Sequence, residues 1–314
     1  MPVAALVRAW SRTAGLAVAF ALVAGSASAQ ILPWEVNIAE VEAGRLRNVA
    51  ERPSRQFVLY QLHLGDVRKS DLVETAAQID RLIESLERGV PSQSIPAAWT
   101  PTLRQQLRQL ESSWGPLRRI AVAGPHEFLR VMQEFVPTES RRADPLSLGY
   151  IDDLTRAFIA ESETLLDTYN GECLKTGLEI CPTARLSGLT AMLGERATKE
   201  AVYVVADIDR VENRKRLQQT IEAYRVQRHA YDANPLFAAV LNPERGVSAR
   251  AAGELLASLR LDWDAMELQF ADLAAGDDKN FDLQTLLDRE EILVDKIQRF
   301  TAVIVRYASL AYGT

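Results

Sequence analysis

Histidine and cysteine are scarce in this chain, which contains three histidines and two cysteines among its 314 residues. No histidine lies near a cysteine, and no CxxC or CxxCH motif occurs. HExxH, Glu-x-x-His pairs, a glycine-rich phosphate loop and the Ser-His-Asp order of a hydrolase are also absent from the sequence. We therefore expect no enzymatic activity, no metal site and no cofactor.

Aromatic residues make up only 7% of the sequence, whereas hydrophobic residues make up 47% and alanine, leucine, glutamate, arginine and glutamine are prominent. This composition favours α-helix. The formal net charge of −6 is modest, and acidic and basic residues alternate along the chain as they do on solvated helix faces. A nucleic-acid partner is therefore not expected.

Beyond the N-terminus, the sequence has no apolar run long enough to span a membrane. Residues 1–29 have the pattern of a secretory signal peptide, with two arginines, an apolar stretch over 14–25 and a small-x-small sequence at 27–29. The apolar stretch is about half of the ~20 residues that the alternative, an uncleaved transmembrane anchor, would need. The mature chain is expected to begin at Gln30 and to be periplasmic.

The two cysteines, Cys173 and Cys181, lie close together in the sequence. In an exported protein such a pair forms a disulfide more often than a metal site or a redox centre. We predict a structural disulfide that closes a loop in a linker over residues 171–183.

Apolar residues recur with alternating steps of three and four, which places one narrow apolar stripe on each helix. Such stripes are typical of the seams through which helices pack in bundles. The predicted seams are Leu72, Ala76, Ile79, Ile83 and Leu86; Leu103, Leu107, Leu110, Trp114, Leu117 and Ala121; Leu256, Leu259, Trp263, Met266, Phe270 and Leu273; and Leu293, Ile297, Phe300, Ile304 and Tyr307.

Breakers and caps divide the chain into two sets of long helices. The predicted fold is all-α, with two tandem four-helix bundles of long antiparallel helices: a first half over residues 30–170 and a second half over 184–314. Pro53 is expected to kink the first helix. The predicted helices span 33–64, 70–88, 101–122, a short 125–135 and 146–169, followed by 184–207, 210–232, 248–274 and 280–311.

The two halves also share sequence. Residues 44–56 align without a gap with residues 188–200, and a glycine, a Glu-Arg pair, a hydroxyl residue and a base recur at matching places. Trp114 and Trp263 fall at corresponding points of the third helix in each half. These matches in the same helix order predict an internal duplication.

The same residues carry a resemblance to a known family. Residues 43–47 and Arg52 in the first half, and residues 187–188, 192–193 and Arg196 in the second, are close to a first-helix pattern A-G-x-x-R-M-L-S-x-R. This pattern, with a tryptophan in a leucine-rich third helix, resembles the PilJ-like sensor domain. That domain is the periplasmic N-terminal region of type IV pilus methyl-accepting chemotaxis transducers, and it is akin to the sensor domain of nitrate/nitrite histidine kinases.

The resemblance implies a ligand site on the first helix. In nitrate-sensing relatives, the arginine three residues after the glycine grips the anion between the first helices of a dimer, because a guanidinium offers a planar fork of donors to a planar oxyanion. The matching residue is Arg47, with Gly44 and Glu51 beside it, and nitrate or nitrite would be the ligand. The second half has Ala191 at the matching position. Alternatively, Arg47, Glu51 and Arg55 form a surface ladder of ion pairs along one helix face.

Further residues are predicted to be structural. Arg52 and Arg196 recur in both halves, which favours a structural role over a ligand role. Trp114 and Trp263 lie in apolar seams and are expected in the core. Glu290 also falls on a seam, where it makes either an ordinary salt bridge or, if buried, a candidate site.

These observations favour a periplasmic, sensor-like ligand-binding or signalling-accessory protein without an output domain of its own. Its expected partner is a small anion or a membrane-bound chemoreceptor or sensor kinase. The alternative function is a structural or interaction module of the cell envelope. The duplication further predicts that the first helices of the two halves pack against each other, as in the dimer of the sensor relatives.

Overall fold

The computed structural model describes residues 31–123, 145–178, 180–234, 247–279 and 281–312. These residues form long α-helices joined by short connections, and they contain no β-strand, so the all-α prediction is confirmed. The predicted signal peptide and the short helix expected at 125–135 lie outside the described residues. Nowhere in the described ranges is a helix both long enough and apolar enough to cross a membrane.

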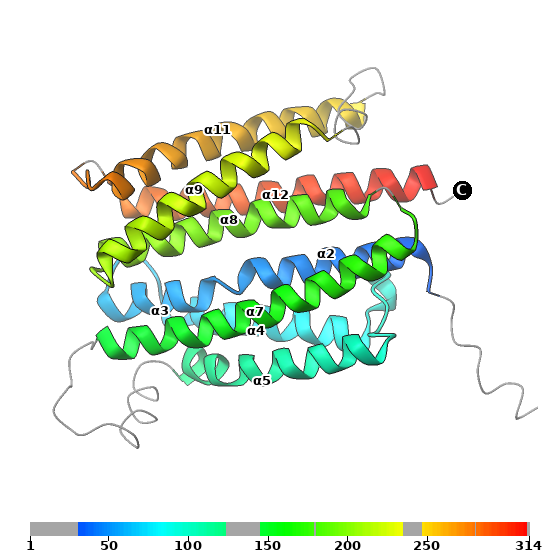
Figure 1. The fold of residues 1–314 in the computed structure, drawn as a ribbon, viewed down its shortest axis with the longest axis horizontal. Helices are drawn as coiled ribbons and strands as arrows, with labels where there is room; N and C mark the ends of the chain where they lie inside the picture. The colour runs from blue at the N-terminus through cyan, green and yellow to red at the C-terminus, as the bar shows by residue number, and fades with distance from the viewer. Residues whose placement is uncertain (1–30, 124–144, 179, 235–246, 280, 313–314) are drawn as a thin grey trace, which may run out of the picture. The chain divides into compact units, whose positions relative to one another are not determined.

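The helices belong to one compact unit, Pro33–Thr314, and run back and forth along a common direction (Figure 1). Apart from the first helix and the linker, their bounds lie within a few residues of the predicted ones. The first set comprises α2 (Pro33–Val49), α3 (Arg52–Leu62), α4 (Lys69–Arg88), α5 (Pro101–Ala123) and α7 (Pro145–Lys175), with a single 3₁₀ turn, η2 (Pro91–Gln93), after α4. The second set comprises α8 (Cys181–Val205), α9 (Arg210–Asp232), α11 (Val247–Ala275) and α12 (Leu283–Tyr312).

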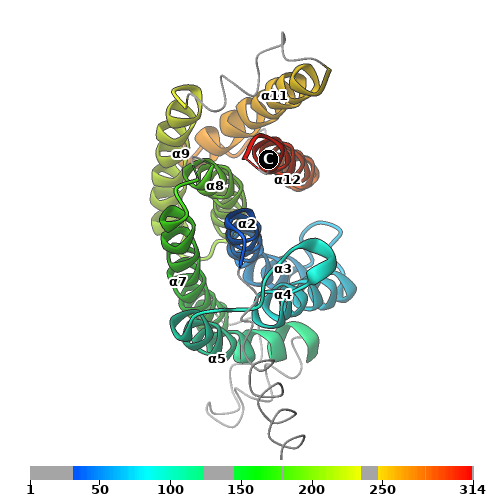
Figure 2. The ribbon, with the colours of Figure 1, turned by 90° about the vertical axis from the view of Figure 1, so that its right-hand side faces the viewer.

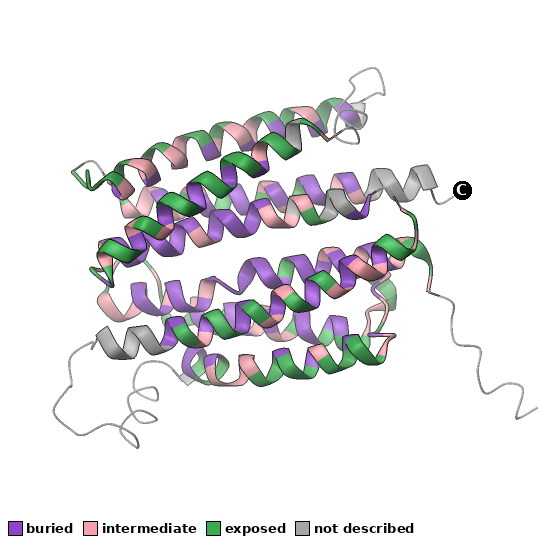
Figure 3. Ribbon diagram, viewed as in Figure 1, coloured by how far each residue is buried: buried purple, intermediate pink, exposed green. Residues whose placement is uncertain are grey.

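Two hydrophobic clusters form the core. One is built mainly from α2, α3, α4, α5 and α7, and the other from α8, α9, α11 and α12. The buried faces of these helices point inward and the exposed faces outward (Figure 3). Every predicted seam residue whose side chain is described is buried, which confirms the seams; the side chain of Tyr307 lies outside the description.

The first helix is divided in two. Helix α2 ends at Val49 and α3 begins at Arg52, so the single helix expected over 33–64 with a kink at Pro53 is two separate helices. Pro53 explains the break, because proline has no N–H to donate to the carbonyl of Val49 and its ring clashes with the preceding turn. Helix α8 has Ala197 at the matching position and is continuous there. The break places the Glu-Arg pair of the first half at the junction of α2 and α3.

Helices α2 and α3 lie directly against α8, side by side in both views (Figures 1 and 2). The predicted contact between the first helices of the two halves is therefore present. The close approach is made at glycines, because a Cβ atom built on Gly188 would lie 3.8 Å from the Cα atom of Gly44. These two glycines are the ones that match in the sequence alignment of the halves.

The predicted disulfide joins Cys173 and Cys181, whose Cα atoms are 5.8 Å apart. The linker is shorter than the predicted 171–183, because α7 continues to Lys175 and α8 already begins at Cys181. The disulfide therefore connects the last turn of one long helix to the first residue of the next.

Candidate functional site

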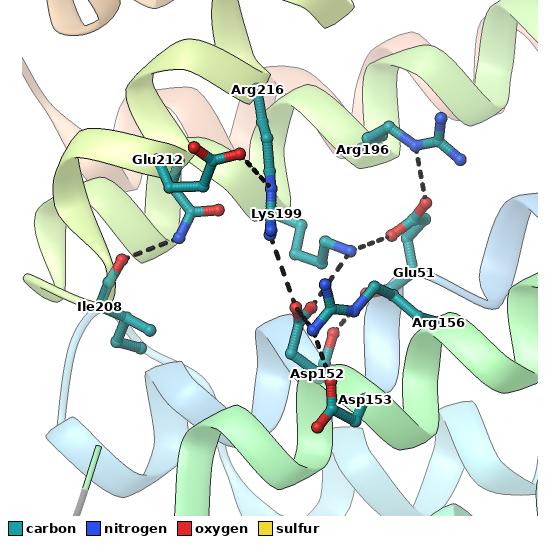
Figure 4. Close-up of polar contacts among 11 residues, drawn as sticks. Glu51, Asp152, Asp153, Arg156, Arg196, Lys199, Ile208, Glu212 and Arg216 are labelled. Carbon is teal, nitrogen blue, oxygen red and sulfur yellow. Dashed lines mark hydrogen bonds and ion pairs between the residues drawn. The ribbon is translucent and has the colours of Figure 1, made fainter. Parts of the chain in front are cut away.

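A buried network of ion pairs crosses the contact between α2–α3 and α8. The carboxylate of Glu51 accepts from Arg196 Nε at 3.0 Å and lies 2.6 Å from Lys199 Nζ. Glu51 is only 1% exposed. Figure 4 shows both cations reaching Glu51 from the neighbouring helix.

A second set of pairs runs in the opposite direction across the same contact. Glu195 of α8 accepts from Arg52 Nε at 2.5 Å and lies 3.2 Å from Arg55 Nη1. Arg55 also donates to Glu290 of α12 at 3.1 Å. Glu195 and Glu290 are both buried, so these guanidinium groups neutralise carboxylates that have no access to bulk water.

The two sets are reciprocal. In the alignment of the halves, Glu51 matches Glu195 and Arg52 matches Arg196, and each glutamate pairs with the arginine of the other half. The matching bases three residues further along are crossed in the same way. Arg55 pairs with Glu195, and Lys199 pairs with Glu51. Mutual exchange of identical contacts is the pattern of a two-fold interface.

The last helix of each set contributes an acidic residue to the network. In α12 this residue is Glu290, and in α7 it is Asp152, whose carboxylate lies 3.7 Å from both Lys199 and Arg216 (Figure 4). Arg156 of α7 lies 3.3 Å from the same carboxylate. Asp152 is buried, so α7 and α12 supply equivalent negative charges on opposite sides of the crossing.

The surrounding charges decide how each carboxyl titrates. Burial by itself would raise the pKa of Glu51, but Lys199 and Arg196 outweigh burial and hold that pKa below its ordinary value. Burial, together with the nearby carboxylate of Glu290, raises the pKa of Glu195 to about 8, against the opposing effects of Arg52 and Arg55. The two carboxyl groups are therefore inequivalent although their sequence positions match.

Glu200, the residue after Lys199, provides a pH prediction. Burial raises its pKa from 4.5 to about 7, with Thr220, Lys199 and Arg196 opposing this effect and Glu51 adding to it. Because the folded state holds this proton more tightly than the unfolded state, the contribution of Glu200 to stability falls as pH rises from about 4.5 to about 7. We compare the free energy of unfolding of Glu200→Gln with that of the wild type. Between pH 4.5 and pH 8 this difference should shift in favour of the variant by up to about 3 kcal/mol.

Urea unfolding of both proteins at each pH measures this difference. Glu254→Gln, at an exposed position of α11, is the control and should show no such pH-dependent gain. An equal stability difference at the two pH values for Glu200→Gln would contradict the prediction.

The alternative of a surface ladder on the first helix is wrong. Arg47, Glu51 and Arg55 are all buried, and each pairs with a residue of another helix instead of with one another. The guanidinium of Arg47, the predicted anion ligand, donates to Glu163 of α7 at 2.7 Å. An anion at Arg47 would therefore have to compete with a carboxylate already in place.

A cavity of about 490 Å³ lies beside the glycine crossing, between α2, α8 and α12. Gly44 and Gly188 both line this cavity, and a Cβ atom at Gly44 would have no neighbouring atom within 4 Å. Much of the wall is aliphatic, formed by Ile38, Val41, Ile95, Leu166, Ile297 and Val305. An apolar wall with a few polar groups is typical of small-molecule sites.

The halves differ in side-chain volume next to this cavity. Where the first half has the Arg47–Glu163 pair on the α7 side, the second half has Ala191 in α8. When α7 and α12 are aligned so that Asp152 matches Glu290, Thr301 of α12 matches Glu163 of α7. Thr301 lines the cavity. The shorter Thr301 side chain thus lines the cavity at the place in α12 that matches Glu163 of α7.

The polar groups of the cavity wall are mostly paired. Three arginines line the cavity, and each forms an ion pair with a carboxylate: Arg45 with Glu42, Arg185 with Asp167, and Arg299 with Asp295. The exceptions are acceptors, because Oε2 of Glu40 and Oδ1 of Asn48 are buried without a hydrogen-bond partner. Burial raises the pKa of Glu40 to about 8, against the opposing effects of the Asn37 amide and Arg185.

The predicted structural residues divide between the network and the core. Arg52 and Arg196 hold the two crossed pairs. Trp114 and Trp263 are buried in the first and second hydrophobic clusters, as predicted. Asp152 is an additional network residue that the sequence does not point to, since no motif surrounds it.

Comparison of the sequence with family models, with curated protein sequences and with solved structures finds no significant match. The function is therefore inferred from the geometry of this chain and from the resemblance of its motifs.

Proposed function

We propose that this chain is a periplasmic, sensor-like protein that binds a small ligand between two tandem PilJ-like four-helix bundles. The observation that carries this proposal is the cavity beside Gly44 and Gly188, at the contact between the first helices. The sensor family that the motifs resemble binds its ligand between first helices, and here a duplicated chain supplies both helices in cis. The protein is a binding component and not an enzyme.

The crossed ion pairs support the tandem interpretation. Glu51 with Arg196, and Glu195 with Arg52, reproduce within one chain the reciprocal contacts of a two-fold dimer. The disulfide between Cys173 and Cys181 is compatible with an oxidising compartment and so with export to the periplasm.

The ligand site is the cavity and not Arg47. Arg47 is held by Glu163 and does not line the cavity, and the arginines that do line it have carboxylate partners. Nitrate and nitrite remain ligands to test, and their binding would have to displace one of these carboxylates. Signal output would pass to a membrane-bound chemoreceptor or sensor kinase.

A second candidate function is an interaction module of the cell envelope. Leu261 and Leu268 are 70% and 69% exposed on one face of α11. Being seven residues apart on a helix, they lie on the same stripe, which could meet a partner helix.

Filling the cavity tests the ligand-binding proposal. Gly44→Leu places a side chain where no atom lies within 4 Å, and it replaces a helical glycine, so stability should be unchanged or raised by up to about 1 kcal/mol. A thermal-shift screen of the mature protein with small anions, including nitrate and nitrite, and with small organic molecules should identify compounds that raise the melting temperature. Gly44→Leu should abolish those shifts.

Gly115→Leu is the matched control, because Gly115 is also a helical glycine with nothing within 4 Å of its Cβ position and lies in α5, away from the cavity. It should retain every ligand-induced shift. Shifts that persist in Gly44→Leu would place the ligand elsewhere, and a screen without any shift would favour the interaction module.

A further inference from the structure

Three helices bring together a carboxyl group and both cysteines. Glu40 of α2, Cys173 of α7 and Cys181 of α8 each offer one ligand atom, and these atoms lie within 4.8 Å of one another. All three residues are buried, with Glu40 only 1% exposed. Glu40 is far from the cysteines in sequence, so only the tertiary structure forms this cluster.

The disulfide alone does not account for a carboxyl group at this place. A disulfide is neutral and donates no hydrogen bond, whereas a buried carboxyl group needs donors or a cation to offset its desolvation. The Asn170 amide donates to Oε1 of Glu40 at 3.0 Å, but Oε2 has no hydrogen-bond partner. Oε2 is therefore a buried oxygen available as a ligand atom.

The surroundings of the sulfur atoms favour thiolates. The side-chain amide of Asn37 donates to Sγ of Cys173 at 3.8 Å. Cys181 is the first residue of α8, where the helix dipole stabilises a negative charge. Ligand-orienting hydrogen bonds of this kind are typical around thiolates that hold a metal ion.

We propose that reduction of the Cys173–Cys181 disulfide converts this cluster into a Zn²⁺ site with two thiolate ligands and the Glu40 carboxylate. The reductant is a thiol: two of its molecules become one disulfide, and their two electrons and two protons convert the cystine into two cysteine thiols. Zn²⁺ then binds as the thiol protons leave to solvent. Thiolates with a carboxylate suit Zn²⁺, whose ligand atoms in a tetrahedral site lie ~3.3–3.8 Å apart. The three atoms here lie within 4.8 Å of one another, and reduction lets the two sulfur atoms separate to that distance.

The cluster adjoins the cavity beside Gly44. Glu40 and Arg185 belong both to its surroundings and to the wall of the cavity beside Gly44. The oxidised chain, in which both sulfur atoms are bonded to each other, holds no ion. The site therefore makes metal binding dependent on thiol redox state.

The test uses the mature chain, reduced anaerobically with a phosphine, which takes oxygen from water to become its oxide, and then desalted. Co²⁺ titration should give thiolate-to-cobalt charge-transfer absorption that saturates at one ion per reduced chain, and Zn²⁺ should displace it. The oxidised chain and Cys173→Ser should give no such absorption. Glu40→Gln should weaken Zn²⁺ binding at least about tenfold, whereas Glu42→Gln, a neighbouring buried glutamate outside the cluster, should not.

Circular dichroism guards against loss of the fold. If the reduced chain loses helicity, Zn²⁺ must restore it in the wild type and not in Cys173→Ser. A reduced chain that binds no Co²⁺, a Glu40→Gln variant with wild-type affinity, or a loss of helicity that Zn²⁺ does not reverse would each overturn the proposal.

Discussion

Replacing Glu51 with alanine is expected to lower the free energy of unfolding by about 3–5 kcal/mol, because it leaves the buried Lys199 and the half-buried Arg196 without their nearest carboxylate. Glu51 is 1% exposed and lies 2.6 Å from Lys199 and 3.0 Å from Arg196. An ion that has lost its partner in a low-dielectric interior keeps its desolvation cost and loses the compensating attraction. Urea unfolding monitored by circular dichroism measures the change.

Two further variants show that the effect arises from the buried pair. Glu84→Ala removes a carboxylate that pairs with Arg88 on the exposed face of α4, and it should cost less than about 0.5 kcal/mol. Lys199→Met added to Glu51→Ala should recover part of the loss, because the ammonium that has lost its nearest carboxylate is then gone. A loss for Glu51→Ala as small as that for Glu84→Ala would show that the network is hydrated and contributes little.

Replacing Trp263 with alanine is expected to cost about 3–5 kcal/mol, as removal of a fully buried aromatic side chain does. Trp263 is fully buried, packs beside Tyr224 and Phe270, and donates its indole N–H to Glu267 at 2.8 Å. The substitution leaves a void in the centre of the second hydrophobic cluster and removes the donor from Glu267.

Leu261→Ala, two residues earlier on the same helix, is the matched control. Leu261 is 70% exposed, so its substitution should change stability by no more than about 0.5 kcal/mol. Thermal and urea unfolding of both variants measure the contrast. A Trp263→Ala variant that loses less than about 1.5 kcal/mol would mean that the cluster refills the space.

The two halves differ in ways that have physical consequences. Pro53 breaks the first helix of one half, whereas Ala197 leaves α8 continuous. The Arg47–Glu163 pair has small counterparts in the second half, Ala191 among them. The cavity lies on the α12 side of the contact, where Thr301 takes the place that Glu163 has in α7.

The sequence by itself determined the helices and their buried faces. Steps of three and four residues place apolar side chains on one stripe, so burial of Leu107, Trp114 or Phe300 follows from local periodicity alone. Glycines, prolines and capping residues likewise set helix ends to within a few residues, because these are properties of the local backbone. At Pro53 the sequence predicts a kink, because proline removes a backbone hydrogen bond. The local rule does not state how far the chain then departs from helical geometry, and the structure shows two separate helices.

Only the tertiary structure decided which charges meet. The spacing of Arg47, Glu51 and Arg55 fits a ladder on a helix surface equally well, but this face is buried, so each side chain turns to a partner on another helix. The matching Glu-Arg pairs indicated a duplication, yet their crossed exchange depends on the close approach at Gly44 and Gly188. Ion pairs between distant segments, the orphaned oxygen of Glu40 and its place beside the disulfide arise from packing between helices, about which periodicity within one helix carries no information.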